Sequence, residues 1–425
     1  MSTGPKQQPI PPEKLKILER QVEFAFLILG IGNLLPFNAI ISVFDFFMKF
    51  QTDYTPQITF PNINFALNCG GQLFLLCASG LLSTKFMLYF SQIATMLSLA
   101  LFPFVVVNYP QHISFPISCL LIVVNGLSTA FSSSSLFGMV SFFPLKCVVA
   151  LGTGQGLSGI VINVLRYIIL IFLGESENVL VQGAFIFFFV SSVIMGICIY
   201  YSYTLFSNIY VIRVLNSKHE AKQDKLIEGE PTEINSSDNE KQVNNKNEFS
   251  FMKLLWKLLD INLLIAISFI TTFSCFPGAS IKPNLFGLPI GFKINSFIFC
   301  FNLCDTIARK LVAYIKPTKT KLYVFTISRL VLIPSFVLVS YAENYKLLPD
   351  NLLSLLALVN VALLALTSGV VNNLAFALAP EQVEDEWKGQ AGSSVSLCLI
   401  IGIFLGSFAG IFVDKLTTFA PVVNQ

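Results

Sequence analysis

Charged side chains are scarce in this sequence of 425 residues. Asp, Glu, Lys and Arg make up 12% of the chain, whereas hydrophobic residues make up 54% and the mean hydropathy is +0.71. Soluble domains carry about 25% charged residues, because their surface must be hydrated. A chain with so little charge cannot cover a globular core with a polar surface. Its composition instead predicts that lipid surrounds much of the protein.

Histidine is nearly absent, which argues against several kinds of site. Only His112 and His219 occur, in or near predicted loops, and no His-Glu-x-x-His pattern is present. The nine cysteines lie mostly inside apolar runs and make no disulfide framework. We therefore expect no enzyme, no metal and no other cofactor. The net charge of +3 is too small for a nucleic-acid-binding surface.

Long apolar runs are abundant. A helix needs about 20 predominantly apolar residues to cross the hydrocarbon core of a bilayer, and eleven runs qualify. They lie near 22–47, 61–83, 86–107, 113–140, 150–173, 180–206, 260–281, 294–315, 322–342, 350–378 and 389–413. Backbone groups in lipid must be hydrogen-bonded within the chain, so each run is predicted to be a helix. The expected fold class is an all-α polytopic membrane protein.

The distribution of Lys and Arg predicts the orientation. Cations occur in the N-terminal segment and in the loops after the second, fourth and eighth runs: Lys6, Lys14, Lys16, Arg20, Lys85, Lys146, Lys316, Lys319 and Lys321. The alternate loops contain fewer cations, and cytoplasmic loops are enriched in Lys and Arg. The N-terminus is therefore predicted to be cytoplasmic, and an odd number of crossings places the C-terminus outside.

A polar segment at 207–259 divides the runs into six and five. It is rich in Asn, Lys, Glu, Asp and Ser, a composition typical of a largely disordered linker, here on the cytoplasmic side. The expected domains are a cytoplasmic segment at 1–21, a first bundle at 22–206, a second bundle at 260–413 and an external tail at 414–425. Two bundles around a long linker indicate a carrier whose halves rock against each other.

The run at 294–315 contains a polar face. Asn302, Asp305 and Arg309 are spaced i, i+3, i+7 and share one side of a helix. A charge at membrane depth costs at least about 2.5–3.5 kcal/mol, so it needs a partner or a wet cavity. Asp305 and Arg309 can form a structural ion pair. The favoured interpretation is a stripe along a solute path, with a carboxylate to accept from hydroxyls and a guanidinium to donate to them.

Other polar residues at membrane depth have different predicted roles. Gln155 can donate and accept, which suits the edge of a heterocyclic base. Arg166 requires a carboxylate, with Asp45 as the candidate, and a structural or gating pair is favoured over solute contact. Arg329 is expected to snorkel to the interface or to take part in a gate rather than to bind the solute.

Several motifs, in chain order, resemble those of the equilibrative nucleoside transporter family. Leu35-Pro36-Phe37-Asn38 is similar to the family's Leu-Pro-Trp-Asn, Gly154-Gln-Gly-Leu-Ser-Gly159 to Gly-Gln-Gly-Leu-Ala-Gly, and Phe301-Asn302-x-x-Asp305-x-x-x-Arg309 to Phe-Asn-x-x-Asp-x-x-Gly-Arg. Arg329-Leu-Val-Leu-Ile-Pro334 is another family-like pattern. The position of Arg166 resembles plant and protist members more than animal ones.

The resemblance implies an eleven-helix fold related to the major facilitator type, and transport of nucleosides or nucleobases by alternating access. Asp305 and Arg309 would contact the ribose, Gln155 the base, and Phe37 the cavity near its outer gate. Asn302 and Asn38 are further expected substrate contacts. Phe37 in place of Trp and Ala308 in place of Gly depart from the family pattern and affect the expected substrate preference more than the class.

Other functions are less well supported. A carrier of organic cations or sugars is one alternative, although a cation carrier needs unpaired acids, and the few acids here have an Arg nearby. A channel would show a repeated pore motif or charged rings, which the sequence lacks. Facilitated and proton-coupled transport both stay open. The expected partners are a nucleoside or nucleobase and the lipid bilayer, with no nucleic acid, and a plasma-membrane location is favoured over an intracellular membrane.

Overall fold

The computed structural model describes residues 11–77, 82–173, 177–216 and 253–418, and all secondary structure within these ranges is helical. The first group of helices comprises α1 (Pro12–Ser42), α2 (Phe44–Phe50), α3 (Pro56–Cys77), α4 (Thr84–Asn108), α5 (Gln111–Val140), α6 (Leu145–Leu173) and α7 (Glu177–Ser207). The second comprises α10 (Leu259–Cys275), α11 (Ile290–Leu311), α12 (Lys319–Ser328), α13 (Leu332–Asn344), α14 (Asp350–Leu378) and α15 (Lys388–Thr418). Short 3-10 turns lie at Ala279–Ile281, Val312–Tyr314, Arg329–Val331, Pro380–Gln382 and Asp385–Trp387.

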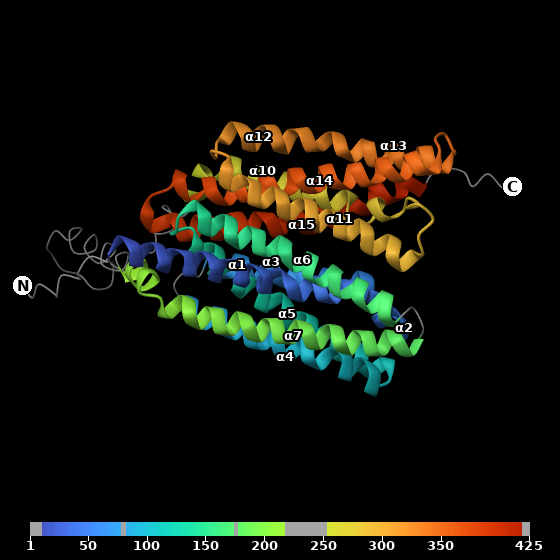
Figure 1. Ribbon diagram of the computed structural model, residues 1–425, viewed down its shortest axis with the longest axis horizontal. Helices are drawn as coiled ribbons and strands as arrows, with labels where there is room; N and C mark the ends of the chain where they lie inside the picture. Colours follow the sequence, from blue (N-terminus) through green and yellow to red (C-terminus); the bar gives the residue numbers. More distant parts are fainter. Residues whose placement is uncertain (1–10, 78–81, 174–176, 217–252, 419–425) are drawn as a thin grey trace, which may run out of the picture.

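The two groups form two bundles that lie side by side (Figure 1). In the first bundle α1 packs on α6, and α5 packs on α3 and α4; in the second, α10 packs on α15 and α11 on α14. The bundles meet where α6 lies against α11 and where α15 lies against α3 and α5. We call the end at which α1 begins the amino-terminal end, and the opposite one the α2 end.

Eight helices of the described part are long and apolar enough to cross a membrane. The 17-residue α10 is apolar but shorter. Neither α3 nor α11, of 22 residues each, is among the eight. Both have polar side chains along their length, and these include seven buried ones: Asn64, Asn68, Gln72, Asn295, Asp305, Thr306 and Arg309. These polar residues lower the hydropathy of both helices.

Local sequence explains several helix ends. The Ser83 side chain accepts a hydrogen bond from the Phe86 amide at 3.2 Å and caps the start of α4. The run expected at 260–281 is interrupted, because the residue before a proline avoids the helical conformation. Phe276 precedes Pro277 and is extended, so α10 ends at Cys275.

Other boundaries differ from the expected ones. Helix α1 begins at Pro12, ten residues before the apolar run, and its first turns are exposed, so hydrophobicity did not mark them. The run at 322–342 is divided into α12 and α13 by the 3-10 turn at Arg329. Residues 209–216 and 253–257 of the expected linker are helical. The rest of that segment, 217–252, and residues 419–425 of the expected tail lie outside the described residues.

Phenylalanine rings fill the core of the first bundle at the α2 end. The Phe47 ring of α2 lies edge-on to Phe60, Phe102 and Phe188, from α3, α4 and α7, with centroids 5.1, 5.5 and 6.1 Å away. Such edge-to-face pairs add about 0.5–1.5 kcal/mol each beyond the area that they bury. The short α2 is thereby fixed against the bundle, which positions Asp45 within it.

A tight contact joins the bundles at the amino-terminal end. The Phe137 ring of α5 stacks on Phe376 of α14 with centroids 3.8 Å apart. Beside it, Ser393 of α15 donates to the Ser134 carbonyl at 3.3 Å. The bundles are therefore in close contact here, and the second seam, between α6 and α11, holds the polar residues that the sequence singled out.

Candidate functional site

Glycines let α6 approach α1 on one side and α11 on the other. A Cβ atom on Gly154 would lie 2.0 Å from the Leu27 carbonyl oxygen of α1. A Cβ atom on Gly159 would lie 2.3 Å from the Asn302 side chain of α11. Atoms cannot approach this closely, so only glycine permits these contacts. The Gly-Gln-Gly-Leu-Ser-Gly motif thus brings the polar face of α11 within hydrogen-bonding distance of α6.

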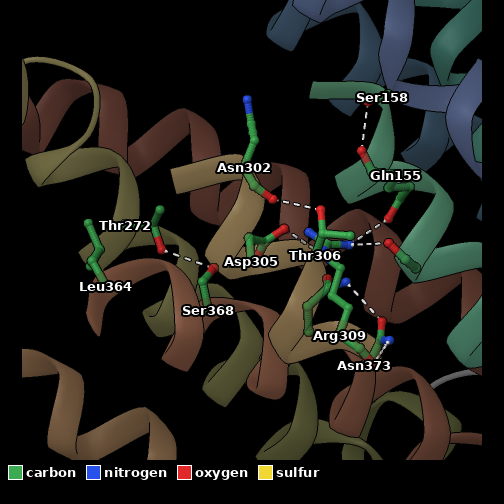
Figure 2. Close-up of polar contacts among 12 residues, drawn as sticks. Gln155, Ser158, Thr272, Asn302, Asp305, Thr306, Arg309, Leu364, Ser368 and Asn373 are labelled. Carbon is green, nitrogen blue, oxygen red and sulfur yellow. Dashed lines mark hydrogen bonds and ion pairs between the residues drawn. The ribbon is translucent and has the colours of Figure 1, made fainter. Parts of the chain in front are cut away.

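Asp305, Arg309 and Gln155 meet at this seam (Figure 2). Arg309 donates from Nε to Asp305 Oδ2 at 2.6 Å, and from Nη1 to Gln155 Oε1 at 3.0 Å and to the Gly152 carbonyl at 3.2 Å. Asp305 and Arg309 are only 4% and 6% exposed. One guanidinium therefore connects a carboxylate of the second bundle with two oxygens of the first.

Only one of the two oxygens of the Asp305 carboxylate has a hydrogen-bond partner among the described residues. Its Oδ2 atom accepts from Arg309, whereas Oδ1 is buried and makes no hydrogen bond within the described part of the chain. An unpaired buried acceptor costs about 1–3 kcal/mol, more when it is charged, so such atoms call for a partner. Asp305 can accept a hydrogen bond from a hydroxyl or N–H group at this position.

Neighbouring side chains that the sequence analysis did not select hold the ion pair in place. Thr306 donates to the Asn302 carbonyl at 2.6 Å, and Asn373 of α14 donates to the Arg309 carbonyl at 2.9 Å (Figure 2). Asn373 is fully buried, beside the equally buried Asn372, in a predominantly apolar stretch of α14. A buried amide in such a stretch is the signal that could have identified it.

An asparagine relay continues the seam toward the α2 end. Asn302 donates from Nδ2 to Asn163 Oδ1 at 2.7 Å, and Asn163 donates from Nδ2 to Asn295 Oδ1 at 2.8 Å. Asn295 donates back from Nδ2 to the Asn163 carbonyl at 3.2 Å. Sequence reasoning missed Asn163 and Asn295. Asn295, Asn302 and Arg309 follow one another at steps of seven, which is the pattern that could have revealed the first.

The Leu-Pro-Phe-Asn motif of α1 supports α6 from the other side. Asn38 donates to Ser158 Oγ at 2.8 Å, and Ser158 donates to the Gln155 carbonyl at 2.6 Å. The Phe37 ring lies 4.9 Å from Phe65 of α3, whose ring lies 6.3 Å from Phe273 of the second bundle. Asn38 is therefore linked to the Gln155 turn, whereas Phe37 joins a row of aromatic rings between the bundles.

Arg166 lies closer to the α2 end and apart from this group. Its guanidinium contacts the Asp45 carboxylate of α2 in an ion pair with partly exposed side chains. Eleven residues of α6 separate Arg166 from Gln155, a rise of roughly 16 Å along the helix. Arg166 therefore pairs with Asp45, as expected, and lies apart from Asp305.

Arg329 does not snorkel, so that part of its expected role is wrong, whereas its part in a gate stays a prediction. The side chain is 0% exposed. Its guanidinium donates to the hydroxyls of Ser268 and Thr272 in α10, the second at 2.5 Å, and to the Leu364 carbonyl of α14 at 3.3 Å. The turn at Arg329–Val331 directs the side chain into the second bundle rather than toward its surface. Among the described residues its hydrogen-bond partners are neutral oxygens.

Comparison with solved structures defines the fold. A proton:xylose symporter of the major facilitator superfamily superposes with a TM-score of 0.65 and 12% identity over 94% of this chain and 88% of that one. The fucose:proton symporter of E. coli gives 0.53 and 12% over 95% and 98%. The chain therefore has the fold of these two structures, with two helical bundles and a buried polar group at the seam between them.

Sequence relatives identify the family. The family described as Nucleoside transporter matches residues 119–414, and the chain belongs to it. Equilibrative nucleotide transporter 7 of Arabidopsis thaliana is 22% identical over 90% of this chain and 92% of its own length. Equilibrative nucleoside transporter 3 of Rattus norvegicus is 22% identical over 90% and 86%. These relatives and structural neighbours are transporters, not enzymes.

Proposed function

We propose that the protein carries nucleosides across a membrane by alternating access, with the α6–α11 seam as the substrate site. Membership of the nucleoside transporter family and the major facilitator fold support this function. In such a carrier the two bundles rock about a site near mid-membrane, so that it opens to one side at a time. Nucleobases, which lack the ribose, are the second candidate substrates of the same site.

The observation that carries the proposal is the half-used carboxylate of Asp305 beside Arg309 and Gln155. The free Oδ1 atom of Asp305 can accept from a ribose hydroxyl, and the guanidinium of Arg309 can donate to the neighbouring hydroxyl oxygen. A buried carboxylate–guanidinium pair is therefore suited to vicinal hydroxyls. Such a group would contribute strongly to selectivity, because a solute without hydroxyls leaves the acceptor unpaired.

Gln155, Asn302, Phe37 and Asn38 complete the proposed site. Gln155 now accepts from Arg309, so it would contact a base after Arg309 turns toward the ribose. Asn302 is half-buried on the same face of α11 and would offer a further polar contact. Phe37 would line the cavity beside the base, and Asn38 would act through Ser158 to hold the turn that contains Gln155.

The proposed topology has eleven crossings in a six-plus-five arrangement. They are α1, α3 to α7, α10, α11, the α12–α13 pair, α14 and α15. The amino-terminal end has Lys85, Lys146 and Lys319 near the starts of α4, α6 and α12 and would face the cytoplasm. The C-terminus would then lie outside. The plasma membrane is the proposed location, with Arg166, Asp45 and the α2 end on its outer side.

The test is uptake of radiolabelled nucleosides and nucleobases by cells that lack their own carriers, at two pH values, with a sugar and an organic cation as competitors. Asp305→Asn is expected to reduce nucleoside uptake at least about 100-fold, because a donor-bearing amide replaces a charged acceptor. Asp260→Asn is the matched control. The Asp260 carboxylate pairs with the Lys319 ammonium group, with 2.7 Å between Oδ2 and Nζ, and this ion pair lies away from the seam. Uptake that is unchanged in Asp305→Asn, or uptake of sugar or cation alone, would contradict the proposal.

A further inference from the structure

The direction of every hydrogen bond in the asparagine relay is fixed by one atom. The carbonyl oxygen of Asn163 can only accept, so the Asn295 group that it contacts at 3.2 Å must be the NH₂ group. Asn295 therefore presents Oδ1 to Asn163, whose NH₂ group donates to it at 2.8 Å. Asn163 in turn presents Oδ1 to Asn302, which must donate at 2.7 Å.

The relay consequently fixes the amide of Asn302. With its NH₂ group held by Asn163, the Asn302 side chain cannot exchange the places of its nitrogen and oxygen, and Oδ1 is left as an acceptor. Asn163 is 1% exposed, and both ends of its amide are bonded to α11, so nothing else competes for it. Asn302 is itself half-buried on the face that carries Asp305.

The relay also crosses from one bundle to the other. Asn163 belongs to α6, whereas Asn295 and Asn302 belong to α11, and the next contact toward the α2 end joins Tyr167 and Ser296 hydroxyls at 2.7 Å. Hydrogen bonds between neutral groups are individually weak and reversible in water. This half of the seam can therefore separate when the bundles move, and separation would release the Asn302 amide.

We infer that Asn163 and Asn295 are positioning residues that hold Asn302 with its oxygen toward the solute while the α2 end of the seam is closed. Asn302 then accepts from a hydroxyl or N–H group of the solute. When the α2 end opens, the amide becomes free to turn and the contact weakens, which favours release on that side. The inference rests on the proposed function for the identity of the solute, but not for the relay itself.

The first experiment measures the relay without any solute. Ser296→Cys gives a thiol at the seam, whose reaction with a membrane-impermeant thiol reagent reports opening of the α2 end, with the chain lacking this substitution as background. Adding Asn163→Leu is expected to speed labelling about tenfold, the effect of losing two interbundle hydrogen bonds. Asn360→Leu removes a buried amide that bonds to Ser335 inside one bundle at 2.9 Å, and is expected to leave the rate unchanged.

The second experiment measures selectivity as a ratio, which a general loss of folded protein does not change. A panel of nucleosides that each lack one hydroxyl or N–H group is compared with the parent. In the unsubstituted protein, the analogue that lacks the group bonded to Asn302 is expected to be taken up about tenfold more slowly than the parent nucleoside. Asn163→Leu and Asn302→Leu are each expected to abolish this difference, and to preserve the difference for the analogue that lacks the group bonded to Asp305. Adding Asn163→Leu to Asn302→Leu is expected to change that ratio no further.

The outcomes separate the inference from the proposed function. Equal labelling rates with and without Asn163→Leu, or an equal loss of uptake for every analogue, would overturn the inference. Faster labelling in a protein that transports no nucleoside would overturn the proposed function, while the relay would retain its support. If Asn163→Leu does not fold, Asn295→Ser provides the same test, because it removes the amide group that the Asn163 carbonyl oxygen orients.

Discussion

Arg309 and Arg329 are both almost completely buried, yet their guanidinium groups meet different partners. Arg309 lies at the seam and bonds to Asp305 of its own helix and to two oxygens of α6. Arg329 lies inside the second bundle and bonds to two hydroxyls of α10 and a carbonyl of α14. The contacts of Arg309 with α6 must break when the bundles move apart, whereas those of Arg329 can persist.

The difference shows that burial of an arginine does not define its role. A guanidinium shared between two bodies can exchange its partners during a transport cycle, because a solute can replace them. A guanidinium bound within one body stabilises that body in every state. We therefore expect the same substitution to affect transport at one site and stability at the other.

Among the arginine substitutions, the largest effect is expected for Arg309→Lys. Lysine keeps the charge, but its single ammonium group cannot reproduce the planar fork that reaches Asp305, Gln155 and the Gly152 carbonyl. Losing charge-assisted hydrogen bonds of about 1.5–3 kcal/mol each should reduce nucleoside uptake about 100-fold. The measurement is initial uptake rate divided by the amount of protein in the membrane. A rate within twofold of the parent chain would remove Arg309 from the site.

A smaller effect of a different kind is expected for Arg329→Lys. The fork again spans three oxygens, so lysine should lower the free energy of unfolding by about 2 kcal/mol. Uptake per folded protein should fall no more than about threefold, since the contacts lie within one bundle. Thermal unfolding of the purified protein in detergent provides the measurement. If uptake disappears while the unfolding temperature is unchanged, Arg329 belongs with Arg309 and the comparison fails.

Sequence analysis located the apolar helices because their signal is local. Twenty consecutive apolar residues indicate a membrane-spanning helix whatever other helices pack against it. Boundaries were harder, since the amphipathic start of α1 at Pro12 has no continuous apolar run. The face of α11 that contains Asn302, Asp305 and Arg309 was also predictable, because helical spacing alone puts these residues together.

The partners across the seam could not be predicted in the same way. Helical spacing states which residues share a face, but not which helix lies opposite that face. The hydrogen bond between Asn163 and Asn302 depends on the contact of Gly159 with Asn302, and helical spacing does not predict that contact. The prediction that the Arg329 side chain points to the membrane interface was wrong for a similar reason. The sequence indicates how deep this residue lies in the membrane, but not whether its side chain points to the surface of the bundle or to its interior.

The smallest effect is expected at the ion pair between Arg166 and Asp45, which provides a third kind of arginine for the comparison. This guanidinium joins two helices of one bundle, as Arg329 does, but both side chains are partly exposed. Such pairs contribute about 0–1 kcal/mol to stability and are screened by salt.

Arg166→Gln should therefore change uptake and unfolding temperature only slightly, about twofold in uptake at low salt and less at high salt. Arg166→Asp should be worse than Arg166→Gln, because two carboxylates would then face each other, and adding Asp45→Arg should restore uptake. A loss as large as that of Arg309→Lys, at any salt concentration, would show that Arg166 contacts the solute.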